Sequence, residues 1–262
     1  MSGSALSLEG VFVRLGERLL IPPLTLSVPP GHVTTVMGPS GCGKSSLLAF
    51  LCGTLDPAFT AGGRVHLGDL EIGDLPPERR RIGILFQDDL LFPHMTVAEN
   101  LAFGLPPDTG GHRARRARVD ATLSEAGLTG FGDRDPATLS GGQRARVALL
   151  RTLLSQPGAL LLDEPFGRLD LRLRDRFRRS VLDHARAQGL PTLLVTHDPA
   201  DAAAAGGPVI EIAVAAEPGL DSHAPAAQPI VVPLHRRPQA SGKNATKREN
   251  PALATRSKPP IH

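Results

Sequence analysis

The chain lacks Trp and Tyr entirely, has only two Cys, and carries nine Phe as the only aromatic residues among its 262. A Tyr nucleophile or acid is therefore excluded, and no indole or phenol is available to stack on a base or to form the aromatic belt of a membrane protein. Hydrophobic residues make up 41% of the chain and charged residues 21%, which is ordinary for a soluble protein. We expect a core of Leu, Val, Ile and Ala in one large domain or in a domain with an appendage.

The two cysteines, Cys42 and Cys52, are too few for a disulfide framework. On one helix they would lie about 15 Å apart, whereas a disulfide requires Cα atoms within about 7 Å. Cys42 precedes Gly43-Lys44, and a thiol near a lysine and a helix N-terminus can have a lowered pKa. We favour a small, loop-filling role for Cys42 over a redox role.

Long apolar runs are missing as well. The N-terminal residues show no basic stretch followed by an apolar one, as a signal peptide requires. No apolar run approaches the roughly 20 residues of a membrane span. We therefore expect a soluble, cytoplasmic protein that serves a membrane, if at all, through a partner.

The positive charge of the chain is concentrated near its C-terminus. Residues 235–262 contain a single acid, Glu249, and seven basic residues: Arg236, Arg237, Lys243, Lys247, Arg248, Arg256 and Lys258. Because this tail has no Phe and is rich in Pro, Ala and Ser, its composition predicts disorder over 216–262. A basic arm that contacts anionic lipid or RNA is the alternative.

Strand and helix patterns alternate along residues 1–215, which predicts an α/β domain with a mostly parallel sheet. The expected strands are Val11–Val13, Leu24–Val28, Val33–Met37, Arg64–Ile72, Arg81–Phe86, Ala159–Leu162, Thr192–Val195 and Val209–Val214. The expected helices are Ser46–Leu51, Ser140–Leu154 and Leu171–Ala187. Residues from about 95 to 155 have few strand signals and indicate a helical subdomain.

Gly38-x-x-x-x-Gly43-Lys44-Ser45 fits the pattern of a phosphate-binding loop between a strand and a helix. Its glycines allow the backbone to curl so that several N–H groups point at phosphate oxygens. The following helix presents its positive N-terminal end to the same anion. Lys44 can bind the β and γ phosphates, and the Ser45 hydroxyl can bind Mg²⁺. A chance match of a Gly-rich turn is the alternative.

Two carboxylates, Asp163 and Glu164, follow the apolar run Ala159–Leu162. Such a run is typical of a strand buried on both faces, and ligands bind at the carboxyl ends of parallel strands. Asp163 can then hold Mg²⁺ or its water, and Glu164 can polarise an attacking water. An acidic helix cap is the alternative, which the phosphate loop in the same chain disfavours.

A second helix start that can bind phosphate follows Leu139. Ser140 is a good N-cap, and Gly141 and Gly142 leave backbone N–H groups accessible. Gln143 and a basic amphipathic helix come next. Two such sites on one chain can bind the same nucleotide if chains pair head-to-tail.

In the same order over residues 5–200, these motifs resemble those of the ATP-binding-cassette (ABC) ATPases. The resembling segments are Gly38–Ser45 (Walker A), Gln87 (Q-loop), Leu139–Gln143 (signature), Leu160–Asp163 (Walker B), Glu164 (catalytic glutamate), Gly167–Asp170 (D-loop) and His197 (switch histidine). The resemblance implies a P-loop NTPase fold with a mostly parallel core sheet, an antiparallel β subdomain and a helical signature subdomain. It also implies ATP and Mg²⁺ as ligands. Two ATP molecules would lie between two chains, with Ser140 and Gly142 reaching the γ-phosphate on the partner's Lys44.

The resemblance assigns a role to each of these positions. The implied catalytic residues are Glu164, His197 and Gln87. The implied metal ligands are Ser45, Gln87 and Asp163. The implied nucleotide contacts are Gly38, Pro39, Ser40, Gly41, Cys42, Gly43, Lys44, Ser45, Ser46, Leu15, Ser140, Gly141, Gly142, Gln143 and Asp170.

Residues Ile82–Phe92 and Asp135–Arg151 are most similar to the small ATPases of thiamine-like and iron/polyamine-like importers. Leu91–Asn100 resembles the segment that helps to receive a permease's coupling helix in bacterial solute importers. The resemblance implies a homodimer, an integral-membrane permease, a periplasmic or surface solute-binding protein, and a place on the inner face of the cell membrane. Candidates for the permease groove are Phe92, Met95, Val97 and Leu101, although a core helix face explains them equally well.

A soluble ABC ATPase without a permease, acting in cofactor assembly or on nucleic acid, is the alternative function. The helical region contains a basic run of Arg113, Arg115, Arg116 and Arg118, for which we favour a solvated helix face. We expect no nucleic-acid partner, because base-stacking aromatic side chains are missing there. A P-loop GTPase or kinase would not explain the signature or His197.

In the ABC family an aromatic residue upstream of Walker A, usually Tyr, stacks on adenine. At that spacing this chain has Leu15-Gly16, and the sequence leaves open whether Phe12 compensates. Base–aromatic stacking is worth about 1–3 kcal/mol and is base-tolerant. We therefore predict weak ATP binding and poor discrimination against GTP.

Overall fold

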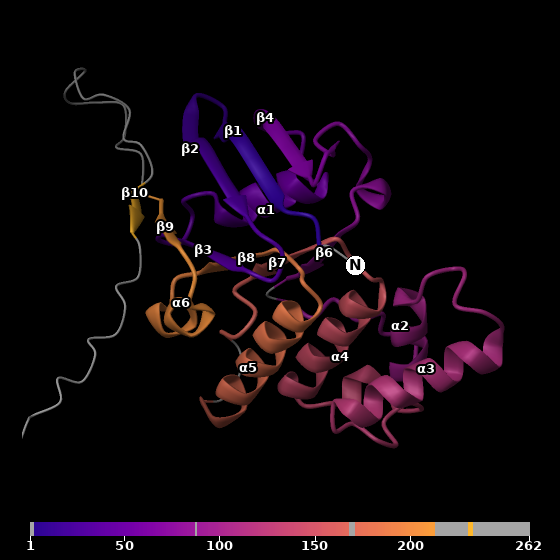
Figure 1. Cartoon of the computed structure of the whole chain (residues 1–262). Helices are drawn as coiled ribbons and strands as arrows, with labels where there is room; N and C mark the ends of the chain where they lie inside the picture. The colour runs from indigo at the N-terminus through magenta and orange to yellow at the C-terminus, as the bar shows by residue number, and fades with distance from the viewer. Residues whose placement is uncertain (1–2, 87, 168–170, 213–229, 233–262) are drawn as a thin grey trace, which may run out of the picture.

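The computed structural model describes residues 3–86, 88–167, 171–212 and 230–232. Two β-sheets form its framework, and helices cover both faces of the larger sheet (Figure 1). This architecture confirms the α/β fold class, with a mostly parallel sheet, an antiparallel sheet and a group of helices.

The smaller sheet is antiparallel, with the order β2-β1-β4-β5. Its strands are β1 (Leu6–Leu15), β2 (Arg18–Val28), β4 (Phe59–Leu67) and β5 (Leu70–Glu71). β1 and β2 are both longer than the strands predicted at Val11–Val13 and Leu24–Val28. β2 is longer because it continues through the Pro22-Pro23 pair. Since β2 lies at the sheet edge, its prolines do not have to donate to a second neighbour. The strand predicted over Arg64–Ile72 is interrupted by the turn between β4 and β5.

The larger sheet has the order β10-β9-β3-β8-β7-β6 and is parallel except for β10. Its strands are β3 (Val33–Met37), β6 (Ile82–Leu85), β7 (Ala159–Asp163), β8 (Thr192–Thr196), β9 (Val209–Glu211) and β10 (Ile230–Val232). Every residue of β7 and β8 is buried, which explains the continuous apolar run that the sequence shows there.

The C-terminal region differs from the prediction in two places. β9 ends at Glu211, so the strand expected over Val209–Val214 is too long. β10 lies inside the segment expected to be disordered and pairs antiparallel with β9, so that expectation is wrong for Ile230–Val232. The other residues of the predicted tail lie outside the described part of the chain.

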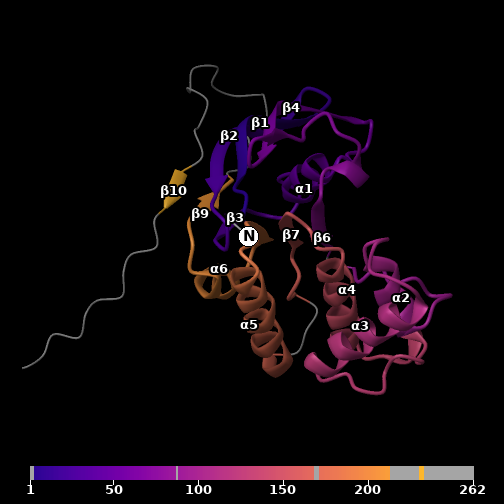
Figure 2. The same cartoon turned by 45° about the vertical axis from the view of Figure 1, so that its right-hand side comes forward.

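Most of the helices fall into three groups, which differ in their position relative to the two sheets (Figures 1 and 2). α1 lies between the two sheets, α4 and α5 cover the opposite face of the larger sheet, and α2 and α3 pack on the far side of α4 from α5. The helices are α1 (Lys44–Cys52), α2 (Val97–Gly104), α3 (His112–Glu125), α4 (Gly141–Leu154), α5 (Leu171–Ala187) and α6 (Pro199–Ala205), with short 3-10 turns at Pro77–Arg79 and Pro136–Thr138. None of them, within the described residues, combines the length and apolar character needed to cross a membrane.

Candidate functional site

The phosphate loop connects β3 to α1, as predicted, and its glycines are required by the backbone. Gly43 has φ 97°, and a Cβ there would lie 2.7 Å from Cβ of Leu20. A Cβ on Gly38 would lie 2.8 Å from the carbonyl oxygen of Ile212. No side chain caps the start of α1, so its first N–H groups are left for an anion.

Lys44 is folded over this loop. Its Nζ donates hydrogen bonds of 2.8 Å to the carbonyl oxygens of both Gly38 and Pro39, and the residue is only 5% exposed. Cys42 is buried beside it, with Sγ 3.9 Å from Nζ, and Cys42 and Cys52 are both free thiols, which confirms the absence of a disulfide between them. The loop therefore concentrates positive charge and unpaired N–H groups at one point.

A cleft of about 470 Å³ joins this loop to the other predicted residues. The loop and the start of α1, the two carboxylates at the end of β7, and residues of the antiparallel sheet all contribute to its lining. Its lining residues are Ser40, Gly41, Gly43, Lys44, Ser45, Ser46, Asp163, Glu164, Leu15, Arg18, Leu20 and Phe59. The structure thus brings together most of the predicted Walker A residues, the two carboxylates and Leu15, whereas Gly38, Pro39 and Cys42 do not line the cleft.

Asp163 and Ser45 are suited to a Mg²⁺ ion. The Ser45 hydroxyl is hydrogen-bonded to the Asp163 carboxylate, and burial, opposed by that bond, raises the pKa of Asp163. Both supply hard oxygen ligands, which Mg²⁺ prefers together with phosphate oxygens and water. Among the described residues there is no cluster of three or more His, Cys, Asp or Glu that could hold a metal by protein ligands alone.

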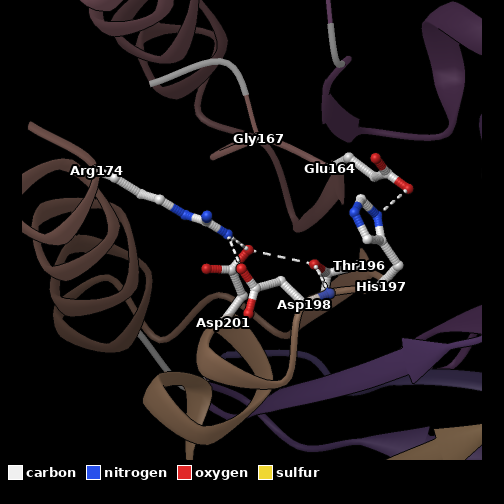
Figure 3. Close-up of a pocket in the computed structure, with 7 residues that line it drawn as sticks. All are labelled: Glu164, Gly167, Arg174, Thr196, His197, Asp198 and Asp201. Atoms are coloured by element: carbon white, nitrogen blue, oxygen red, sulfur yellow. Dashed lines mark hydrogen bonds and ion pairs between the residues drawn. The ribbon is translucent and has the colours of Figure 1, made fainter. Parts of the chain in front are cut away.

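Glu164 and His197 form a second group beside the cleft (Figure 3). Nδ1 of His197 lies 2.9 Å from Oε1 of Glu164, and Glu164 adopts a left-handed backbone with φ 44°. The backbone N–H of Glu164 donates to the carbonyl oxygen of Val195 at 2.9 Å, which fixes this conformation at the end of β7. A pocket of about 150 Å³ opens next to the pair. Its lining residues are Glu164, Gly167, Arg174, Thr196, His197, Asp198 and Asp201.

The signature segment starts α4 as predicted, but it lines neither pocket. The Ser140 hydroxyl accepts from the Gln143 N–H at 3.3 Å, and the Gln143 side chain accepts from the Ser140 N–H at 2.9 Å, so the two residues form a capping box. Gly141 is exposed next to this cap, whereas Gly142 is buried. Within one chain, then, this helix start and the phosphate loop do not form a common site.

Two predicted site residues, Gln87 and Asp170, lie outside the described residues. The segment after Gln87 is nevertheless attached to α4. Asp89 accepts a 2.8 Å ion-paired hydrogen bond from Arg144, and the Leu90 carbonyl oxygen accepts from Arg151 at 3.0 Å. These contacts connect the chain that follows Gln87 to the helix that follows the signature.

Phe59 and Arg18 line the cleft, although the sequence did not indicate either. The register of β1 pairs Leu15 with Phe59 on β4 and with Arg18 on β2. Phe12 packs against Gly62 instead: a Cβ added at Gly62 would lie 2.8 Å from the Phe12 ring. The chain therefore has an aromatic side chain beside Leu15, and it is Phe59. The sequence holds no local signal for this placement; it shows only that an aromatic contact, if present, must come from one of the nine Phe residues.

The proposed permease groove is partly wrong. Val97 and Leu101 are completely buried in the core between α2, α3 and α4, so they cannot line a groove. Phe92 and Met95 are half-buried, and the ring of Phe92 contacts that of Phe103 with centroids 4.8 Å apart. Phe103, which the sequence did not suggest, is 64% exposed.

Two of the four arginines in the basic run of α3 make contacts within the chain. Arg115 donates to the carbonyl oxygens of Pro106 and Ala102 at 2.9 and 2.6 Å. Arg116 pairs with Asp120 and Asp133, at 3.2 Å each. At least these two arginines therefore stabilise the helical region itself.

Comparisons with known proteins agree with this geometry. A family model described as ABC transporter matches residues 21–167. The Escherichia coli (strain K12) protein named uncharacterized ABC transporter ATP-binding protein YnjD is 50% identical over 193 residues, which are 74% of this chain and 88% of that protein. The spermidine/putrescine import ATP-binding protein PotA of Bacillus cereus is 39% identical over 75% of this chain, and the Fe(3+) ions import ATP-binding protein FbpC of Brucella abortus is 40% identical over 79%. This chain spans only 59% and 58% of the lengths of those two relatives.

Solved structures give the same picture. The bacterial ABC transporter cassette MJ0796, solved as a dimer, matches with a TM-score of 0.69 and 29% identity over 79% of this chain and 94% of that one. Its post-hydrolysis state bound to ADP and Pi also matches with a TM-score of 0.69, over 80% of this chain and 96% of that one.

Proposed function

Since the chain belongs to the family of ABC transporter ATP-binding proteins, which bind and hydrolyse ATP, we propose that it is the ATPase subunit of a membrane importer for a small solute. The observation that carries the proposal is that Glu164, bonded to His197, lines the same cleft as the phosphate loop. The names of two relatives, import proteins for spermidine/putrescine and for Fe(3+), support the direction of transport. The chemical identity of the solute would be set by a separate permease and solute-binding protein.

In this proposal the phosphate loop binds the ATP phosphates. The free N–H groups at the start of α1 and the Lys44 ammonium group supply positive charge where negative charge must be neutralised. Ser45 and Asp163 hold Mg²⁺ with the phosphates, and the bound ion neutralises developing charge on them. Gln87 would also coordinate Mg²⁺ or the attacking water.

Glu164 acts as the general base that accepts a proton from the attacking water. His197 holds the Glu164 carboxylate through Nδ1, and its side chain, which is 60% exposed, is accessible to the γ-phosphate of a bound ATP. The left-handed backbone of Glu164 costs about 1–3 kcal/mol, a kind of strain that is concentrated at functional sites.

The start of α4 binds the ATP held by a second copy of the chain. Ser140 and Gly142 contact its γ-phosphate. This arrangement explains why Ser140 and Gly141 are exposed and separate from the phosphate loop within one chain. The relative solved as a dimer supports a pair of chains.

At the inner face of the cell membrane, this chain binds an integral-membrane permease through the groove next to the Gln87 loop. Leu90 and Phe103 are 54% and 64% exposed. Arg151 donates to the Leu90 carbonyl oxygen and covers the Phe92 ring at 5.0 Å, and that ring in turn contacts Phe103. A permease bound to the apolar surface of Leu90 and Phe103 would lie next to the Gln87 loop and could influence the ATP site through it.

The proposal is tested by purifying the chain with its co-encoded membrane protein. The ATPase rate of the complex in lipid vesicles should rise when the cognate solute-binding protein is present. Phe103→Glu should abolish co-purification and leave the ATPase rate of the isolated chain unchanged. Leu70→Glu, at a 53% exposed position on the antiparallel sheet, is the matched control and should still co-purify. ATPase activity stimulated by DNA, without a membrane partner, would favour the soluble alternative.

A further inference from the structure

The backbone that carries His197 is attached to α5 through a cluster of buried charges (Figure 3). Arg174, on α5, donates from Nη2 to carboxylate oxygens of both Asp198 and Asp201, the latter at 2.9 Å. The side chain of Asp201 is 2% exposed and that of Arg174 is 17% exposed. Water therefore screens these ion pairs only weakly.

Both neighbours of His197 in the sequence belong to this cluster. The Thr196 hydroxyl donates to Asp201 at 3.2 Å and accepts from the backbone N–H of Asp198 at 3.0 Å. Asp198 also accepts the N–H of Ala200 at 2.7 Å and so caps α6. The position of the His197 backbone is thus fixed on both sides by groups bonded to Arg174 or to its partner Asp201.

The cluster depends on Arg174 for its charge balance. Asp198 and Asp201 both present a carboxylate oxygen to the same guanidinium nitrogen. Arg178 bonds to the other oxygen of Asp201 at 2.9 Å and to Asp175, and it acts on Asp198 only without direct contact. Without Arg174, Asp198 would have no cation in contact and would be repelled by Asp201.

We propose that Arg174 is a positioning residue that, through Asp198 and Asp201, holds His197 beside Glu164 and thereby sets the rate of ATP hydrolysis. The inference rests on the proposed roles of Glu164 and His197. Arg174 lines the pocket next to this pair, yet its Nη2 is already bonded to two carboxylates. We therefore assign Arg174 to the shape of the site through these two carboxylates.

The test compares Arg174→Met and Arg174→Lys with the wild-type chain in steady-state ATPase assays. Since a misplacement of about 1 Å at a catalytic group can cost ~10²-fold in rate, Arg174→Met should lower kcat by roughly 10- to 100-fold and change the KM for ATP less than about twofold. Arg174→Lys keeps one charge and should recover part of kcat. Asp198→Asn, which retains a good N-cap, should lower kcat by a smaller factor and serves if Arg174→Met does not fold.

Arg116→Met is the matched control, because Arg116 also pairs with two aspartates but lies exposed on α3, away from both pockets. It should leave kcat unchanged. The imidazole NMR signal of His197 should shift in Arg174→Met and not in Arg116→Met, and the kcat deficit should persist well below the Tm of each variant.

Three outcomes would overturn the inference. They are an unchanged kcat in Arg174→Met, a raised KM at unchanged kcat, and a kcat deficit that disappears on cooling. Glu164→Gln and His197→Ala separate this failure from failure of the proposed function. If those two variants hydrolyse ATP normally, the proposed roles are wrong. If they are inactive while Arg174→Met is normal, only the positioning role is wrong.

Discussion

The carboxylate of Glu164 and the imidazole of His197 meet at 2.9 Å across the ends of two neighbouring parallel strands, β7 and β8. Each residue is the first after its strand, and the strands pair in a register that places Asp163 opposite Val195. The register of the sheet therefore brings the two backbones side by side. The charged cluster around Asp201 then fixes the residues on both sides of His197.

Glu164→Gln should bind ATP and hydrolyse it ~10²–10⁴-fold more slowly, as expected on loss of a general base. The amide keeps the size of the side chain but cannot accept a proton from water. Single-turnover hydrolysis of ATP and calorimetric binding measure the two effects separately. Glu99→Gln, at the exposed cap of α2, should leave the rate unchanged. Near-normal turnover by Glu164→Gln would remove Glu164 from the role of base.

Lys44→Ala should lose ATP binding, in contrast to Glu164→Gln. A hydrogen bond to a charged group contributes about 1.5–3 kcal/mol, so we expect ATP affinity to fall by at least roughly tenfold. Isothermal titration with ATP checks this. Arg64→Ala removes one positive charge from an exposed ion pair with Glu9 and should bind ATP normally. Equal affinity in Lys44→Ala and Arg64→Ala would contradict the proposed phosphate contact.

The sequence predicts best where function depends on residue types at a fixed short spacing. The phosphate loop and the Ser140 cap are each contained in a few consecutive residues, so both could be placed on the correct elements. The β7 carboxylates could also be located, because a buried parallel strand has an unmistakable apolar run.

The sequence fails where the outcome depends on packing between distant segments. Phe59 reaches the cleft through its register with Leu15, and no local pattern encodes a strand register across so many residues. Val97 and Leu101 lie on an apolar helix face, and periodicity cannot tell whether such a face is covered by α3 and α4 or left for a partner. The link between Arg174 and Asp201 likewise requires the packing of α5 on α6.

Cys52 should make stability fall in alkaline solution. Burial raises the pKa of its thiol from 9.0 to about 12. Above about pH 9 the unfolded thiol ionises while the folded one stays protonated, so its stabilising contribution, complete below that pH, is lost as the pH rises towards 12. The free energy of unfolding of the wild-type chain should fall by about 1 kcal/mol more per pH unit in that range than that of Cys52→Ala. Urea unfolding at pH 8 and pH 10 checks this, and parallel pH dependence in both proteins would contradict it.

Phe59 should carry the contact with the adenine base that a Tyr makes in related ATPases. It lines the ATP cleft opposite Leu15, which is 44% exposed. Since base–aromatic stacking is worth about 1–3 kcal/mol, Phe59→Ala should weaken ATP binding by roughly 5- to 150-fold and weaken GTP binding equally, because stacking tolerates any base. Direct binding of both nucleotides measures this, with kcat at saturation expected to stay unchanged.

The matched pair Phe59→Leu and Phe12→Leu separates stacking from stability. Both substitutions remove one aromatic ring from the same sheet, but Phe12 packs on Gly62 and should not affect the nucleotide. Leu15→Tyr in the Phe59→Leu background supplies a ring from the opposite strand and should restore affinity. If Phe59→Leu binds ATP as well as Phe12→Leu does, the base does not lie against Phe59. If only Leu15→Tyr tightens binding, the adenine lies at Leu15 without an aromatic partner, and the wild-type chain binds ATP weakly for that reason.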